Sequence, residues 1–192
     1  MFPLVANLHG RRVVVVGAGR VGVDKAKTLL ECGALVTMIA ERVLAPLPEG
    51  LDQVLLRSYE NGDLKGAMLV VAATASVTAN DDIVREANER GILLNVVDDQ
   101  TRSSFYFTAN YRDGDVLVSV STAGASPALA QWVRARVAQA LPKNLAPVAR
   151  RLREERSKLH EAGESTERRP WSQRVSELVD EFGDNENSLA RD

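Results

Sequence analysis

Residues 12–22, RVVVVGAGRVG, decide the fold of this chain. The four valines form an unbroken, β-branched apolar run, which is typical of a strand buried on both faces of a parallel sheet. A helical pattern follows from Val23 to Cys32 and ends at Gly33. A second apolar strand, from Leu35 to Ile39, comes next. The order strand, glycine loop, helix, strand indicates the first half of a nucleotide-binding unit.

The three glycines of this loop each have a mechanical reason. Gly17 lets the chain turn tightly out of the strand, Gly19 lets a pyrophosphate approach the backbone, and Gly22 lets the helix pack closely. The free N–H groups at the start of the helix favour the phosphates. Glu41, about twenty residues farther on, can accept hydrogen bonds from ribose hydroxyls and would repel a 2′-phosphate. The pattern predicts NAD binding, although Arg42 could also meet a 2′-phosphate; the alternative is a glycine-rich turn that only packs.

The bulk properties exclude several classes of protein. The 192 residues allow one domain with an appendage or two small domains, and 45% hydrophobic and 26% charged residues are ordinary for a globular chain. A net charge of -2 argues against nonspecific nucleic-acid binding. No apolar run approaches the ~20 residues that cross a membrane, and the N-terminus lacks signal-peptide features. Cys32 is the one cysteine, so no internal disulfide can form and we expect a cytoplasmic protein. The two histidines, His9 and His160, are too few for a zinc site built from His and Cys.

Further strands and helices alternate through the first half of the chain. Apolar runs predict strands at Val54–Leu56, Met68–Ala73 and Ile92–Val97, and Asn80–Arg90 has a helical pattern that stops at a glycine. This alternation predicts an α/β fold with a Rossmann-type, doubly wound parallel sheet.

After Asp99 the pattern changes. Phe105–Phe107 and Val116–Ser121 resemble strands, and Asp113-Gly114 between them is a hairpin signal. These segments predict a small strand region that follows the parallel sheet.

The rest of the chain is predicted to be helical. Ser126 suits an N-cap and Pro127 a first helical position, for a helix that ends near Leu141. Further helices are expected at 145–159 and, with one apolar stripe, from Trp171 to Phe182.

The chemistry is expected at the carboxyl ends of the strands, where ligands bind in an open α/β sheet. Asp98 follows one of these strands, so its carboxylate could act as a general base or stabilise charge near a nicotinamide. The alternative is a turn or capping role. Consecutive extended residues point in opposite directions, so we expect Asp98 or Asp99, not both, to face the site. The cofactor contacts that we predict are Gly17, Gly19, Arg20, Val21, Gly22, Glu41, Thr74 and Asn95.

Several segments recur in the order found in one enzyme family. They are the glycine motif, Ala72-Ala73-Thr74 with Asn80, Asn95-Val96-Val97-Asp98, Phe105-Tyr106-Phe107, and the stretch from Val118 to Ala130. Through them, residues 1–160 resemble the precorrin-2 dehydrogenase family, the N-terminal module of siroheme synthase. Some members of this family also insert iron into sirohydrochlorin.

The resemblance implies an organisation and a reaction. It implies an NAD-binding Rossmann domain in residues 1–112, a dimerisation region of strands and a helix in 113–144, and a helical C-terminal domain in 145–183. The remaining tail, 184–192, is expected to be disordered. In a homodimer of this kind, precorrin-2 gives a hydride to NAD⁺ and loses protons to become sirohydrochlorin. Asp98 matches the catalytic aspartate of the family.

The same resemblance implies a substrate site. Precorrin-2 is a polycarboxylate, so arginines should contact it through paired hydrogen bonds, although each could instead be a solvated surface charge. The loop before the helix at Pro127 matches the substrate-adjacent segment of the family. The candidate substrate contacts are Ser121, Thr122, Gly124, Ser126, Arg102, Arg112 and Arg134, with Arg136 as a further candidate.

This chain departs from the family at three positions, and two other functions stay open. The family often has proline at position 100 and Asn or Asp at position 75, where this chain has Gln100 and Ala75. Some members carry a phosphorylatable serine where Thr122 stands.

One alternative is a bifunctional enzyme that also inserts Fe²⁺, with no resident metal site. The other is a non-catalytic, nucleotide-sensing domain like those of potassium transport systems. No methyltransferase module is expected, and the sequence leaves iron or cobalt insertion undecided.

Overall fold

The computed structural model describes residues 1–167 and 169–189 and divides the chain into two compact units. The first unit comprises Met1–Phe107 and the second begins at Thr108.

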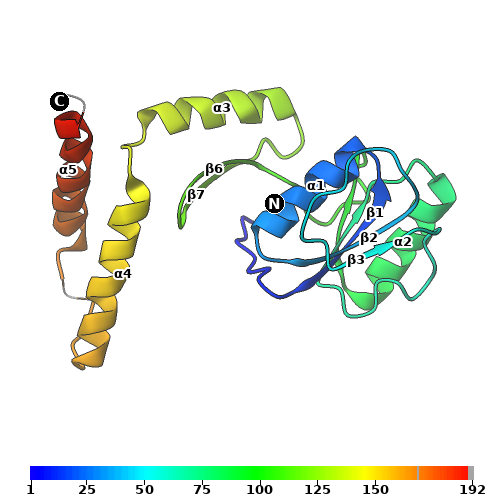
Figure 1. Ribbon diagram of the computed structural model, residues 1–192, viewed down its shortest axis with the longest axis horizontal. Helices are drawn as coiled ribbons and strands as arrows, with labels where there is room; N and C mark the ends of the chain where they lie inside the picture. Colours follow the sequence, from blue (N-terminus) through cyan, green and yellow to red (C-terminus); the bar gives the residue numbers. More distant parts are fainter. Residues whose placement is uncertain (168, 190–192) are drawn as a thin grey trace. The chain divides into compact units, whose positions relative to one another are not determined.

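The first unit is a five-stranded parallel sheet with two helices (Figure 1). The strand order β3-β2-β1-β4-β5 places β1 at the centre, as in a Rossmann-like α/β fold, and confirms the predicted parallel sheet. The elements are β1 (Arg12–Ala18), α1 (Arg20–Glu31), β2 (Leu35–Val43), β3 (Gln53–Leu55), β4 (Leu69–Ala72), α2 (Val77–Arg90) and β5 (Leu93–Val96).

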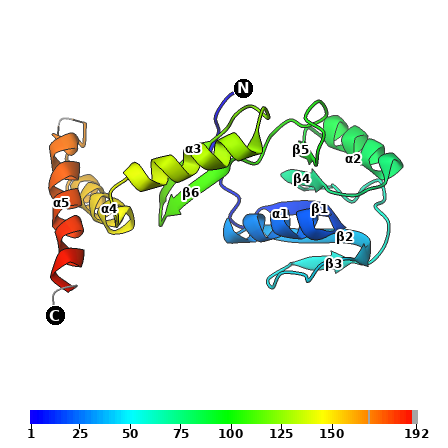
Figure 2. The same ribbon diagram turned by 90° about the horizontal axis from the view of Figure 1, so that it is seen from above.

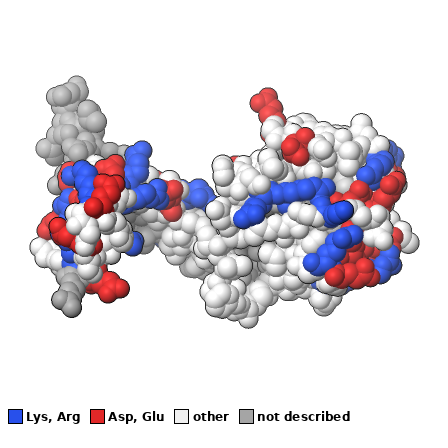
Figure 3. Space-filling view, turned by 90° about the horizontal axis from the view of Figure 1, so that it is seen from below, with Lys and Arg blue, Asp and Glu red and all other residues white. Residues whose placement is uncertain are grey.

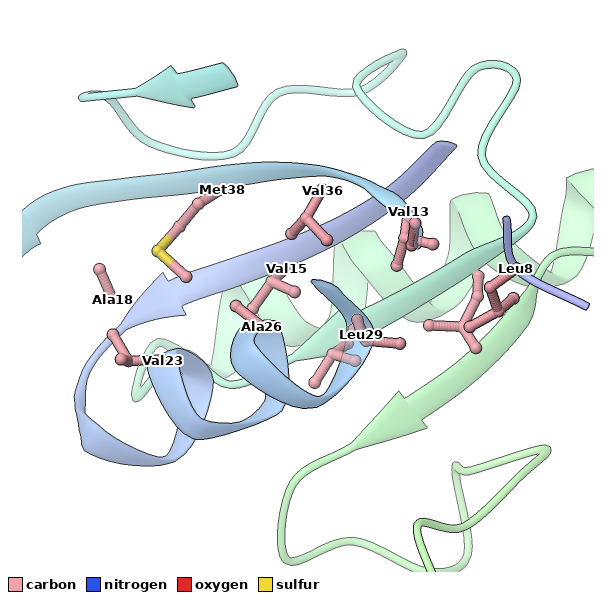
Figure 4. Packing of buried hydrophobic residues seen from close by; sticks show 12 residues of the cluster. Leu8, Val13, Val15, Ala18, Val23, Ala26, Leu29, Val36 and Met38 are labelled. Carbon is pink, nitrogen blue, oxygen red and sulfur yellow. The ribbon is translucent and has the colours of Figure 1, made fainter. Parts of the chain in front are cut away.

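The valines of β1 build both halves of the core. Val13 and Val15 pack in the cluster that includes the α1 residues Val23, Ala26 and Leu29 (Figure 4). Val14 and Val16 pack in a second cluster, which includes residues of α2. Because successive strand residues face opposite sides, α1 and α2 cover opposite faces of the sheet. This arrangement is the reason the central strand carries no polar residue between Val13 and Val16.

A buried carboxylate anchors α2 within the first unit. Glu86 is 1% exposed, and it accepts hydrogen bonds from the Tyr59 hydroxyl, from Gly62 N at 2.8 Å and from Arg90 Nε at 2.6 Å. Burial favours the protonated acid, but these hydrogen bonds outweigh it and lower the pKa of Glu86. The charge is therefore compensated, and it ties the loop after β3 to α2.

The second unit begins with an antiparallel hairpin, β6 (Ala109–Asp113) and β7 (Val116–Val120). The predicted strand at Phe105–Phe107 is wrong: both phenylalanines pack against the core of the first unit, and the strand starts at Ala109. Aromatic residues suit a strand and a core contact equally well, so their composition could not separate the two. The predicted hairpin turn after Asp113 is confirmed.

The described part of the second unit continues with three helices: α3 (Pro127–Ala140), α4 (Leu145–Glu161) and α5 (Trp171–Leu189). Helix α3 contacts both strands of the hairpin, and α4 lies beside α5 (Figure 2). Acidic and basic side chains alternate over α4 and α5 (Figure 3), where Arg174 pairs with Glu155 at 2.6 Å. Of the tail expected to be disordered, residues 184–189 belong to α5, and residues 190–192 lie outside the described residues. Within the described ranges, no helix is long and apolar enough to span a membrane.

Asp113 joins the hairpin to α4. Its Oδ2 accepts hydrogen bonds from Leu145 N at 2.6 Å and Ala146 N at 3.2 Å, the first amides of the helix. The residue at the N-cap position, Asn144, has a left-handed backbone and makes no side-chain cap. A side chain distant in sequence therefore caps α4 in its place.

Candidate dinucleotide-binding site

The glycine loop is closed tightly against the end of β4. Gly17 has φ +110°, and a Cβ there would lie 2.3 Å from the carbonyl oxygen of Ala73. A Cβ at Gly22 would lie 2.0 Å from the carbonyl oxygen of Gly17. Only glycine fits both positions, so the loop, the first turn of α1 and the end of β4 form one compact edge.

Gly19 differs from the other two glycines because it borders open space. It is the N-cap of α1, and a Cβ on it would meet nothing within 4 Å. No side chain of a described residue caps the helix, and the first α1 amides, those of Arg20, Val21 and Gly22, have no partner inside the helix. Free amides beside open space suit the pyrophosphate of a dinucleotide, which the helix dipole also favours.

A bulge in β2 brings Glu41 opposite the glycine loop. Val16 pairs with Ile39 but Ala18 pairs with Val43, so residues 40–42 bulge outward across from Gly17. Strand β2 thus continues past Ile39, where the apolar pattern had predicted its end. Glu41 is exposed, and its Oε1 accepts a hydrogen bond from the Ser58 hydroxyl. The predicted ribose acceptor therefore lies at the same edge as the phosphate cradle.

Thr74 follows β4 at this edge. Its hydroxyl accepts a hydrogen bond from Ser76 N at 3.1 Å, and its carbonyl accepts one from Asn80 Nδ2 at 3.1 Å. Asn80 Oδ1 is buried and has no hydrogen-bond partner within the described part of the chain. Thr74 and Asn80 thus shape the turn that Gly17 contacts.

Asn95 lies inside the unit. It is 9% exposed, and its Nδ2 donates to the carbonyl oxygen of Phe105 at 3.1 Å. The amide holds the chain segment after β5 against the sheet. Asn95 is therefore buried beside the candidate site and does not face solvent.

The two aspartates after β5 have opposite surroundings. Asp98 is exposed, has φ 61°, and makes no hydrogen bond or ion pair with any described residue. Asp99 accepts hydrogen bonds from the Thr101 hydroxyl at 2.7 Å and from Arg102 Nε at 2.6 Å. These bonds, that of Thr101 first, lower the pKa of Asp99 to about 2. Asp98 therefore keeps an uncommitted carboxylate, whereas Asp99 fastens the loop.

The candidate arginines also differ in what they contact. Arg102 is bound to Asp99 and, through Nη1 at 2.7 Å, to Asp81, and these hydrogen bonds raise its pKa. Arg112 is exposed on β6 and has no partner among the described residues, whereas the Nε of Arg134 is buried without one. Arg136 lies over the Trp132 ring at 5.2 Å. Arg112 and Arg134 thus keep donors free for an acidic ligand.

The hydroxyls of the loop before α3 serve the loop itself. Thr122 Oγ1 accepts from Ser126 N and donates to Ser126 O, both at 3.1 Å. Ser126 Oγ caps α3 by accepting from Leu129 N at 3.2 Å, which confirms the predicted N-cap. Ser121 Oγ accepts from Ala123 N, and Gly124 has φ 85°. This network fixes the loop in one shape.

Sequence reasoning missed two residues of the first unit. Ser58 reaches Glu41 from the segment after β3, and no local pattern marks it. Lys25 of α1 lies 4.1 Å from the centre of the Phe107 ring, and burial lowers its pKa. No cluster of three or more His, Cys, Asp or Glu that could hold a metal ion occurs in the part of the chain that the structure describes.

The fold and the glycine loop define an NAD(P)-binding module of the Rossmann type. The chain belongs to the family described as "Putative NAD(P)-binding", whose profile matches residues 4–109. This membership agrees with a nicotinamide dinucleotide at the cradle between Gly17 and Gly22.

Known relatives share more of the chain than this family profile. Siroheme synthase of Azotobacter vinelandii is 39% identical over 158 residues, which cover 79% of this chain and 34% of that protein. Siroheme synthase 2 of Aeromonas salmonicida is 37% identical over 145 residues, 74% of this chain and 30% of that protein. The chain thus spans about a third of the length of these relatives.

A solved structure shares the fold. It is described as "SirC, precorrin-2 dehydrogenase", with a TM-score of 0.71 and 23% identity, and the match covers 95% of this chain and 89% of that one.

Proposed function

We propose that this chain is a dehydrogenase that oxidises precorrin-2 to sirohydrochlorin with NAD⁺. The observation that carries the proposal is the unpaired Asp98 carboxylate, held with φ 61° at the edge of the sheet that also bears the glycine cradle. Asp adopts a left-handed backbone more readily than most side chains, so this turn holds Asp98 while its carboxylate stays free of the loop. The similarity to siroheme synthases, together with the name of the solved structure, supports precorrin-2 as substrate.

The proposed cofactor is NAD⁺, held at its phosphates by the loop from Gly17 to Gly22 and at its adenosine ribose by Glu41. Bound NAD⁺ supplies the acceptor for a hydride. A carboxylate at the end of β2 favours a ribose hydroxyl over a 2′-phosphate, which supports NAD⁺ over NADP⁺. Thr74 would line the same edge, and Asn95 would hold the segment after β5 in place.

Asp98 is proposed to accept the proton that leaves precorrin-2 with the hydride. Its carboxylate has no competing partner among the described residues, whereas Asp99 is already fully engaged. Proton acceptance by a positioned side chain contributes about 10²–10⁴-fold to a rate.

Arg112 and Arg134 are the arginines proposed to meet the substrate carboxylates. Both keep unpaired donors, while Arg102 would have to leave Asp81 and Asp99 to bind a third carboxylate. The loop with Ser121, Thr122, Gly124 and Ser126 is proposed to border the substrate through its backbone, because its hydroxyls serve the loop.

We further infer a homodimer formed through residues 113–144, in the cytoplasm. Leu129 and Trp132 of α3 are large apolar side chains that are 50% and 59% exposed. A second copy that covers this surface would bury both side chains.

Anaerobic turnover of precorrin-2 with NAD⁺, followed by the absorbance of NADH, tests the proposal. The decisive variant is Asp98→Asn, because Asn tolerates a left-handed backbone that would strain alanine. We expect the variant to bind NAD⁺ as the parent does and to lose at least about 100-fold in rate. Asp52→Ala, at the amino end of β3, is the matched control and should turn over normally.

Two results would contradict the proposal. If the parent binds NAD⁺ but never turns over precorrin-2, the nucleotide-sensing function takes its place. If Asp98→Asn turns over normally, Asp98 is not the base. Adding Fe²⁺ or Co²⁺ to the sirohydrochlorin formed then tests metal insertion.

A further inference from the structure

The carboxylate of Glu41 does not lie free at the edge of the sheet. The hydroxyl of Ser58, in the segment after β3, donates a hydrogen bond to Glu41 Oε1. Both residues are exposed, and they are 17 positions apart in the chain, so the contact depends on the pairing of β2 with β3. A carboxylate offers about four acceptor positions, and Ser58 occupies one of them. The others are left for a ligand.

The cation beside Ser58 is already neutralised. Arg57 donates from Nη1 and Nη2 to the two carboxylate oxygens of Asp63, at 2.8 and 2.7 Å. These hydrogen bonds raise the pKa of Arg57, and the paired geometry leaves its charge committed. An Arg next to a ribose is the residue that accommodates a 2′-phosphate. This pairing leaves Arg42, which has no partner among the described residues, as the cation in the bulge beside Glu41.

We propose that Ser58 is a positioning residue that fixes Glu41 for the adenosine ribose and thereby selects NAD⁺ against NADP⁺. The inference rests on the proposed cofactor. With one oxygen anchored by Ser58, the carboxylate can accept hydrogen bonds from the ribose hydroxyls without first losing rotational freedom. A 2′-phosphate, which carries roughly 1.5 to 2 negative charges at neutral pH, would face this fixed carboxylate.

The test measures dissociation constants of NAD⁺ and NADP⁺ for the full chain by titration calorimetry. The variants are Ser58→Ala, Ser58→Thr, which keeps the hydroxyl, and Glu41→Gln, which removes the charge. Ser157→Ala is the matched control, because Ser157 is exposed on α4 and its hydroxyl has no partner among the described residues.

We expect the parent chain to prefer NAD⁺. Ser58→Ala should weaken NAD⁺ binding about 3- to 10-fold, because the Glu41 side chain must then be ordered when the ribose binds, and it should leave NADP⁺ binding nearly unchanged. The preference for NAD⁺ should therefore narrow. Ser58→Thr and Ser157→Ala should keep the parent ratio, and Glu41→Gln should improve NADP⁺ binding. A general loss of folding would weaken both dinucleotides equally, so the ratio separates positioning from damage.

The proposal and the cofactor assignment fail in different ways. An unchanged ratio in Ser58→Ala together with a changed ratio in Glu41→Gln overturns the role of Ser58 and leaves NAD⁺ binding intact. A parent that binds NADP⁺ as tightly as NAD⁺ overturns the selection, with Arg42 as the residue that meets the phosphate. A parent that binds neither dinucleotide overturns the proposed cofactor itself.

Discussion

Alanine at Gly22 and at Gly19 should separate the stability of the fold from dinucleotide binding. A Cβ at Gly22 would lie 2.0 Å from the Gly17 carbonyl oxygen and 3.3 Å from Ala73 Cβ, so α1 must move away from the loop. Overpacking of this kind costs about 1–3 kcal/mol, and alanine regains about 0.5–1 kcal/mol over glycine inside a helix. Because the clash is with a backbone carbonyl, the upper end of the overpacking cost applies, and we expect Gly22→Ala to lower the free energy of unfolding by about 2 kcal/mol.

Gly19→Ala should leave the fold nearly unchanged. The backbone there, with φ −80° and ψ 174°, suits any residue, and the added Cβ meets nothing within 4 Å. Alanine is a poorer N-cap than glycine by up to about 1 kcal/mol, but it restricts the unfolded chain by a similar amount. The Cβ would, however, fill the space beside the first α1 amides. Loss of one or two hydrogen bonds to a charged phosphate should weaken NAD⁺ binding about 10- to 100-fold.

Urea unfolding followed by circular dichroism, with calorimetry of NAD⁺ binding, checks both variants. Each variant is the control for the other, because both add one methyl group within the same loop. If Gly19→Ala binds NAD⁺ like the parent, the phosphates do not approach at Gly19 and the cradle is misassigned. If Gly22→Ala unfolds at the same urea concentration as the parent, the contact with the Gly17 carbonyl does not limit the packing of α1.

Three further predictions concern carboxylates. Glu86→Ala should cost about 2–4 kcal/mol of unfolding free energy, because it removes a buried acceptor of three hydrogen bonds. The control Glu89→Ala, at an exposed position of the same helix, should cost under about 0.5 kcal/mol, and urea unfolding measures both costs. Asp113→Ala should cost about 1 kcal/mol in the same assay, because α4 loses its cap. The control Asp115→Ala, which breaks a surface ion pair, should cost less. Equal costs would show that Asp113 does not stabilise α4 as a cap. The folded pKa of Asp99 is depressed to about 2, so its contribution to stability is present above about pH 4 and is lost as the pH falls toward 2. The difference in unfolding free energy between the parent and Asp99→Asn should therefore shrink over that range. A difference that stays constant with pH would contradict this prediction.

The sheet and the glycine loop could be predicted because their signals are local. The valines of β1 are buried on both faces of the sheet, and four consecutive apolar residues in the sequence indicate this burial directly. The bulge of β2 opposite Gly17 could not be predicted, because it arises from pairing with β1 and not from the sequence of β2 alone. For the same reason Glu41 was expected at the end of the strand, whereas β2 continues past it to Val43.

The strand ends that carry the candidate residues could be predicted, but the hydrogen bonds of those residues could not. That Asp98 follows a strand end could be seen from the apolar run before it. The bond of Asn95 to the Phe105 carbonyl spans ten positions, and that of Arg102 to Asp81 spans 21. Such contacts have no periodic pattern, so an arginine that is engaged in the folded unit looks the same in the sequence as Arg134, whose Nε is not.

The difference between Asp98 and Asp99 is decided by the backbone rather than by side-chain chemistry. At Asp98 the chain takes φ 61°, which leaves its carboxylate in solvent and turns the following residue back toward the sheet. Asp99 then bonds to Thr101 and Arg102, and Arg102 is held in turn by α2 through Asp81. Because these bonds lie directly after the left-handed residue, they stabilise the conformation that keeps Asp98 free. A loop that used both carboxylates for its own hydrogen bonds would leave neither Asp98 nor Asp99 available to a ligand.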